Sequence, residues 1–70
     1  MDKKICVIGG GRWGKNHIRT LAGLGCLAAV VEADAARLKE YTEQYPGIKG
    51  YADMDEAIAC GYDGYTVALP

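Results

Sequence analysis

The chain has 70 residues, of which 50% are hydrophobic and 24% are charged, and its formal net charge is −1. This length allows one domain or part of one, and the composition is typical of a soluble globular protein. The small net charge, with basic residues scattered along the chain, argues against a nucleic-acid-binding surface or a polybasic membrane patch. The longest apolar stretch, residues 21–31, is interrupted by glycines and is too short to span a bilayer.

Short apolar runs alternate with helical patterns along the chain. Residues 4–8 and 27–31 are rich in β-branched side chains, which predicts strands buried on both faces. Residues 13–24 predict a helix with Gly25 as its left-handed cap. A second helix begins after Asp34, the predicted N-cap, and ends before Pro46.

The last third of the chain repeats this alternation with shorter elements. Residues 48–52 predict a weak strand, and residues 65–69 a final strand. Asp53 followed by Glu56 is a variant of the capping box and opens a short helix that ends at Gly61. The order β-α-β-α-β-α-β requires a parallel sheet with right-handed crossovers. We therefore predict an α/β fold, a partial doubly wound (Rossmann) sheet with strand order 3-2-1-4.

Glycines gather where the first strand ends, in the stretch VIGGGRWGKNH. Gly9, Gly11 and Gly14 stand in the register G-x-G-x-x-G, after a strand and at the start of a helix. Glu32 ends the next strand, 18 residues beyond Gly14 and 23 beyond Gly9, which brackets the spacing of a dinucleotide-binding fingerprint. The alternative is that the glycines only form a tight turn.

Each position of this pattern has a physical role in holding a dinucleotide. Gly9 permits the turn, Gly11 lets the backbone approach a pyrophosphate, and Gly14 lets the helix pack closely. The amides and the positive dipole end of the helix face the phosphates. Glu32 accepts hydrogen bonds from ribose hydroxyls and repels a 2′-phosphate, which favours NAD over NADP, although Arg37 nearby weakens that preference.

The segments VIGGGRWGKNHIRTLAGLG, VVEAD and YTVALP resemble the start of the Gfo/Idh/MocA oxidoreductase family over the whole chain. Within it, the run G-R-W-G-K-N-H is most similar to dehydrogenases that oxidise UDP-N-acetylhexosamines or their uronates at C3. The resemblance implies that NAD is bound by Gly9, Gly11, Arg12, Trp13, Gly14, Glu32, Leu69 and Pro70. Leu69 stands where the family usually has Thr, so the contact made by that hydroxyl is absent.

The resemblance also implies that the catalytic residues follow residue 70, in a Glu-Lys-Pro motif and a separate substrate domain. We therefore expect residues 1–70 to be a truncated dinucleotide-binding domain without catalytic residues of its own. The parent enzyme would transfer hydride between a nicotinamide and a secondary alcohol of a sugar or sugar nucleotide. We expect that parent to be a homo-oligomer, with no nucleic-acid or membrane partner.

Two alternatives remain open from the residues alone. The strand endings also fit an FAD-binding domain, although the helix after Gly14 lacks the small residues usual there. A non-catalytic nucleotide-binding module is the other alternative. A methyltransferase fits less well, because Ile8 stands where an acid is usual.

The histidine and the cysteines give no sign of a metal site. His17 has no partner residue at metal-ligand spacing, and we interpret it as structural. The three cysteines, Cys6, Cys26 and Cys60, are odd in number and lack metal-type spacing, which predicts free thiols and a reducing cytoplasm.

Overall fold

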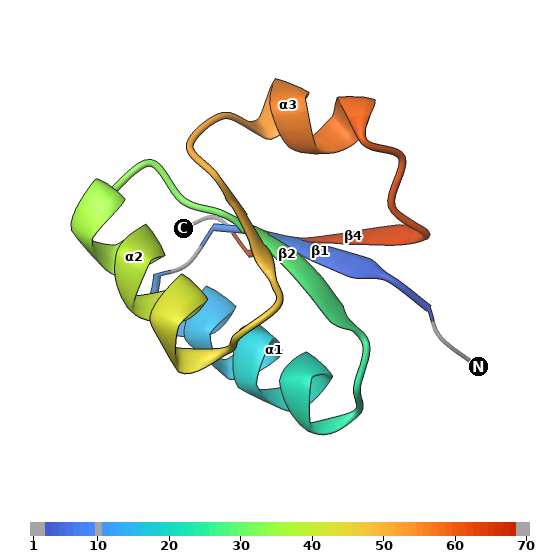
Figure 1. Ribbon diagram of the computed structural model, residues 1–70, viewed down its shortest axis with the longest axis horizontal. Coiled ribbons are helices and arrows are strands. Elements are labelled where there is room, and N and C mark those ends of the chain that lie inside the picture. Colours follow the sequence, from blue (N-terminus) through green and yellow to red (C-terminus); the bar gives the residue numbers. More distant parts are fainter. Residues whose placement is uncertain (1–2, 10, 69–70) are drawn as a thin grey trace.

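The computed structural model describes residues 3–9 and 11–68, apart from the side chains of Arg12 and Trp13. The elements in chain order are β1 (Ile5–Ile8), α1 (Arg12–Gly23), β2 (Leu27–Val31), α2 (Ala35–Gln44), β3 (Lys49–Tyr51), α3 (Met54–Ala59) and β4 (Gly64–Val67). Figure 1 shows this alternation along the chain, with the sheet between α3 and the other two helices.

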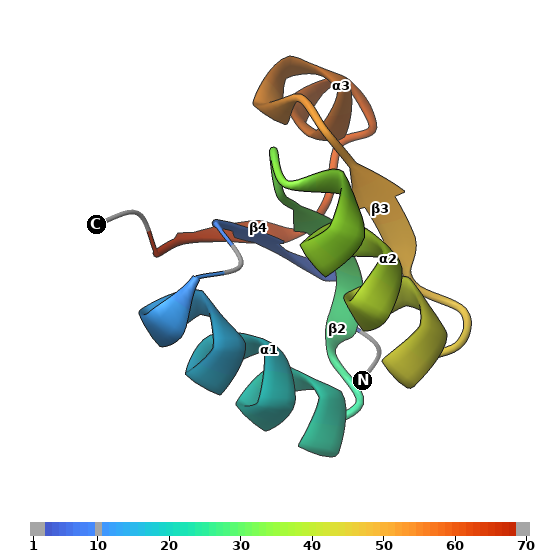
Figure 2. The ribbon, with the colours of Figure 1, turned by 90° about the vertical axis from the view of Figure 1, so that its left-hand side faces the viewer.

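The four strands form one parallel sheet in the order β3-β2-β1-β4, which confirms the predicted fold class and strand order. β1 is central, and its Cys6 lies opposite Ala29 of β2 and Tyr65 of β4. Helices α1 and α2 cover one face and α3 covers the other (Figure 2). This division follows from right-handed crossovers, since the chain moves outward through β2 to β3 and then returns past β1 to β4.

Each face of the sheet carries its own apolar cluster, because successive side chains of a strand point to opposite faces. Toward α1 and α2 the buried residues are Val7, Ile18, Val30 and Tyr41. Toward α3 they are Cys6, Ile8, Ala29, Val31 and Ala57. The predicted burial of both central strands is therefore confirmed, and Cys6 is fully buried, as expected of a small apolar side chain.

The helix ends follow the signals in the sequence. Gly25 adopts a φ of 73° just beyond α1, and Asp34 caps α2 by accepting hydrogen bonds from the amides of Ala36 and Arg37. The Asp53 side chain caps α3 by accepting a hydrogen bond from the amide of Asp55, two positions along the chain. The capping box predicts that it accepts from the amide of Glu56 instead, three positions along. The extended backbone at Asp53 directs its short side chain to the nearer amide, in an Asx turn.

Candidate functional site

The carboxyl ends of the strands are joined by backbone hydrogen bonds. The Gly9 amide donates to the Val31 carbonyl at 2.9 Å, and the Ala68 amide donates to the Ile8 carbonyl at 2.8 Å. These bonds fix the start of the glycine loop between the ends of β2 and β4. In open parallel sheets this edge, next to the first crossover, is where ligands bind.

Two of the three fingerprint glycines are required by the fold itself. Gly9 has a φ of 98°, a conformation that side chains disfavour. A Cβ on Gly14 would overlap the carbonyl oxygen of Gly9 and come within 2.7 Å of its carbonyl carbon. Gly14 therefore allows α1 to pack against the end of β1, the role predicted for it.

Gly11 stands in a different environment from the other two. A Cβ built on Gly11 would meet, among the described residues, only Nη1 of Arg37, at an ordinary contact distance of 4.0 Å. Its φ of −76° is accessible to any residue. Within the described part of the chain, neither packing nor backbone geometry requires glycine at position 11.

The first turn of α1 presents backbone amides without a side-chain cap. The Lys15 amide donates to the Gly11 carbonyl at 2.8 Å, so the amides of residues 12–14 precede the first bond of the helix. Gly11, as N-cap, has no side chain to accept from them, and the first turn contains no acidic residue. Amides in this position, together with the helix dipole, favour an anion.

Glu32 follows β2 at the same edge, and its amide donates to the Tyr51 carbonyl at 2.9 Å. Its side chain is only 11% exposed, and Oε1 lies 3.4 Å from Nη1 of Arg37, whose side chain is 47% exposed. Because Nη1 of Arg37 also lies nearest to the open position at Gly11, the guanidinium stands between the acid and the glycine loop. The structure thus brings Gly9, Gly11, Gly14 and Glu32 to one edge, with Arg37 added.

Other predicted residues are placed less fully. Arg12 and Trp13 lie in the first turn of α1, but their side chains are outside the described part of the chain. Leu69 and Pro70 are also outside the described residues. His17 is exposed on α1 rather than packed against the sheet.

The described residues give two findings on other classes of site. They contain no group of three His, Cys, Asp or Glu side chains that could hold a metal ion. Among the helices in the described part, none has the length and apolarity needed to cross a membrane.

Comparison with known proteins gives two similar sequences. The chain is 41% identical over 71 aligned positions to an inositol 2-dehydrogenase of Arthrobacter sp. (strain FB24). It is 39% identical over the same length to an inositol 2-dehydrogenase of Pseudarthrobacter chlorophenolicus. Each alignment covers 96% of this chain and 21% of the relative, so the chain spans about a fifth of their length. No family model and no solved structure matches the chain.

Proposed function

We propose that this chain is the dinucleotide-binding part of a nicotinamide-dependent oxidoreductase of the Gfo/Idh/MocA type. The observation that carries the proposal is that a Cβ at Gly11 would meet only Arg37 Nη1 among the described residues, at an ordinary contact distance, so the described packing does not account for this glycine and the close approach of a ligand would. The identity to two inositol 2-dehydrogenases supports the same assignment.

The residues at the carboxyl edge fit a dinucleotide. The amides of residues 12–14 would receive the pyrophosphate, and the bare backbone at Gly11 would let it approach. Glu32 would accept hydrogen bonds from the hydroxyls of the adenosine ribose. When bound, the nicotinamide supplies hydride transfer to or from a carbon that carries an alcohol.

Glu32 favours NAD over NADP at this edge, and Arg37 reduces that preference. The Glu32 carboxylate would repel a 2′-phosphate, while the guanidinium of Arg37 beside it would attract one. The Glu32 carboxylate can also accept hydrogen bonds from a free ribose 2′-hydroxyl, which NADP lacks, and this supports NAD as the preferred cofactor.

The substrate of the whole protein is proposed from similarity alone. The relatives' name points to a cyclic polyol, whereas the run G-R-W-G-K-N-H favours a sugar nucleotide. In both substrates the group to be oxidised would be a secondary alcohol on a ring. We assign no general base for this step to residues 1–70. A panel of inositol, sugars and UDP-sugars, assayed with the full-length protein, separates the two.

Titration of the chain with NADH, followed by nicotinamide fluorescence, tests the cofactor proposal. We expect saturable binding that is weaker for NADPH and weakened about tenfold or more by Glu32→Ala, the loss expected for a hydrogen bond to a charged group. Glu40→Ala, an exposed carboxylate on α2, is the matched control and should leave binding unchanged.

Gly11→Ala is the sharper variant, because it separates a ligand site from a tight turn. We expect the unfolding temperature to stay close to that of the parent chain and NADH binding to be lost. Undiminished NADH binding by a folded Gly11→Ala chain would contradict the proposal. Saturable binding of FAD alone, in a parallel titration, would move the chain to the flavoproteins.

A further inference from the structure

A second concave region lies at the amino ends of the strands, at the opposite edge of the sheet. It has a volume of about 600 Å³ and is lined by residues 3–4, 25–28, 47, 49, 51 and 60–62. Most of these residues lead into or begin the four strands, and Tyr51 ends β3. Its volume is within the range of small-molecule sites. Because β1 and β2 have four and five residues, the lining residues at their amino ends lie about 15 Å along the sheet from the glycine loop.

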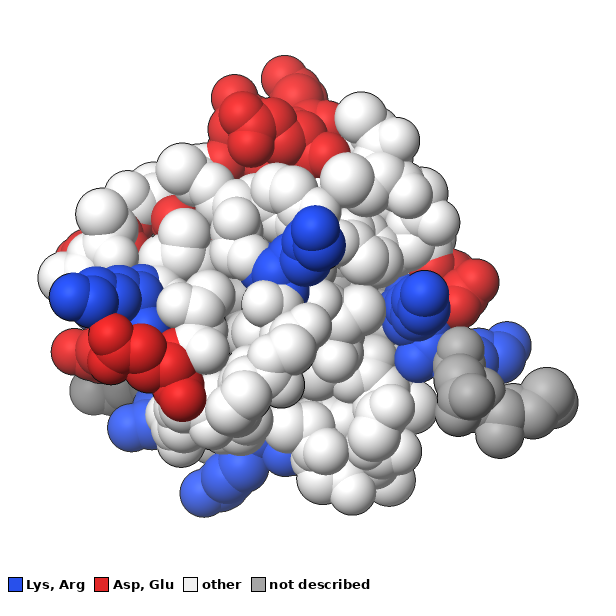
Figure 3. Space-filling view, in the orientation of Figure 1, with Lys and Arg blue, Asp and Glu red and all other residues white. Residues whose placement is uncertain are grey.

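The charged residues that line this amino-edge pocket are all basic. Lys3, Lys4 and Lys49 line it, and no acidic residue is among its described lining residues. The carboxylate of Asp63 nearby is held by the backbone amide of Lys4, which donates to Oδ2 at 2.8 Å. In Figure 3, acidic side chains gather over α3, and none lies between the basic side chains in the middle and at the right of this face.

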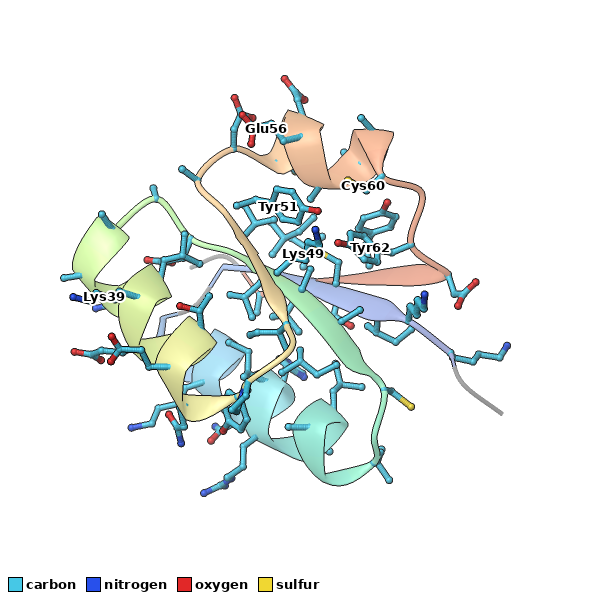
Figure 4. All side chains as sticks on the ribbon, viewed as in Figure 1. Lys39, Lys49, Tyr51, Glu56, Cys60 and Tyr62 are labelled. Carbon is cyan, nitrogen blue, oxygen red and sulfur yellow. The ribbon has the colours of Figure 1, made fainter. Side chains whose placement is uncertain are left out.

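Hydroxyl and thiol groups form a chain on the pocket wall. Oη of Tyr51 lies 2.8 Å from Oη of Tyr62 and 3.1 Å from Sγ of Cys60. Figure 4 shows these three side chains together beneath α3, with Lys49 on β3, the strand that Tyr51 ends. The hydrogen bonds to Cys60 and then to Tyr62 raise the pKa of Tyr51 above its ordinary value of 10.

The hydrogens on the Tyr51, Tyr62 and Cys60 side chains outnumber the hydrogen bonds between them. Two hydroxyls and one thiol carry three hydrogens, and the two hydrogen bonds between them use two. Whichever group donates in each bond, one hydrogen is left for a ligand. Together with the lysine ammonium groups, the wall therefore presents donors to an acceptor-rich molecule.

We propose that the amino-edge pocket binds a small organic anion whose carboxylate or phosphate oxygens accept hydrogen bonds from Lys4, Lys49 and the hydrogen-bonded groups Cys60–Tyr51–Tyr62. The volume exceeds that of an inorganic ion, and Leu27 with the rings of Tyr51 and Tyr62 supplies apolar walls for a carbon skeleton. Of the lining residues, Tyr51 is bonded through its carbonyl to the amide of Glu32 at the cofactor edge, so a bound anion and NADH can be tested for coupling in one titration.

Amide chemical shifts of the ¹⁵N-labelled chain, recorded during titration at low salt, test this proposal. The probes are citrate, which carries carboxylates, glycerol 3-phosphate, which carries a phosphate, and neutral glycerol. We expect saturable shifts of residues 25–28, 47–51 and 60–62 with at least one anion and none with glycerol. Which anion binds more tightly identifies the acceptor group.

Lysine variants show whether the pocket or the overall charge is responsible. Loss of one charged donor at a partly exposed site should weaken binding between about threefold and tenfold, so we expect that loss for Lys49→Gln and a larger one when Lys4→Gln is added. Lys39→Gln is the matched control, since Lys39 lies on α2 with a side chain 76% exposed and outside the pocket.

Three results would overturn the proposal: shifts that grow without saturation for both anions, equal weakening by Lys39→Gln, or displacement of the bound anion by NADH. The last would show that the anion occupies the cofactor edge. We also titrate the Lys4→Gln/Lys49→Gln double variant with NADH. If it binds NADH but no anion site is found, the anion proposal fails while the proposed cofactor function stands.

Discussion

Replacing Gly14 by alanine tests the packing on which the candidate site depends. The new Cβ would overlap the Gly9 carbonyl oxygen and lie 2.7 Å from the carbonyl carbon. Both atoms belong to the backbone, so no change of rotamer can relieve the contact. To bring the carbon contact to an ordinary distance of about 3.4 Å, α1 must move outward by about 0.7 Å, and the overlap with the oxygen requires more.

The cost can be set against the gain from alanine in a helix. Overpacking costs about 1–3 kcal/mol and sometimes more, and the rigid contact places this variant at the upper end. The higher helix propensity of alanine relative to glycine stabilises the folded state by up to about 1 kcal/mol. We expect a net loss of about 2 kcal/mol, which lowers the unfolding temperature of a domain this small by roughly 8–16 °C.

Gly23→Ala is the control in the same helix. A Cβ at Gly23, the last residue of α1, meets nothing within 4 Å among the described residues. The same substitution should therefore raise stability, by a few tenths to about 1 kcal/mol. Thermal and urea unfolding followed by circular dichroism measures both variants. If Gly14→Ala unfolds at the same temperature as the parent or above it, α1 does not dock on the end of β1 as described.

Two further predictions concern a helix cap and a buried thiol. Asp34→Ala removes the acceptor for the amides of Ala36 and Arg37, at 3.0 and 3.2 Å, and should lower the free energy of unfolding by about 1 kcal/mol in urea, whereas Asp34→Asn should retain most of it. Burial, and then the charge of Cys60, raises the pKa of Cys6 from 9.0 to about 11. The unfolded chain releases this proton at lower pH than the folded chain, so stability present below pH 9 should decline toward pH 11. Urea midpoints for the parent and Cys6→Ala should show a shallower decline in the variant, and parallel curves would contradict the assignment.

The order and type of the elements could be predicted because each boundary carries its own chemical signal. Gly25 ends α1 and Asp34 begins α2, as predicted from the residue types alone. Strand ends were less accurate: the third strand is Lys49–Tyr51 rather than 48–52, and the fourth begins at Gly64 rather than at residue 65. Strand bounds depend on which backbone groups find partners in neighbouring strands, and one sequence segment does not contain that information.

Side-chain partnerships between elements were harder to predict. Arg37 was recognised as a nearby charge, but its pairing with Glu32 joins a strand end to a helix and follows no helical spacing. Tyr41 packs in the core on the face covered by α1 and α2. The contact of Tyr51 with Cys60 and Tyr62 requires the crossover from β3 to β4, which brings these residues to one face.

The three fingerprint glycines separate into structural and functional positions once the packing is known. Gly9 has a positive φ, and Gly14 lies against the Gly9 carbonyl, so a tight turn with a closely docked helix would select both without any ligand. Gly11 is not accounted for in this way, because alanine fits there in the described structure. Gly11 lies beside helix amides without a side-chain cap and near Glu32, whose side chain is 11% exposed, and this supports the proposal that a ligand approaches the backbone there. The case for a cofactor therefore depends on position 11 more than on the motif as a whole.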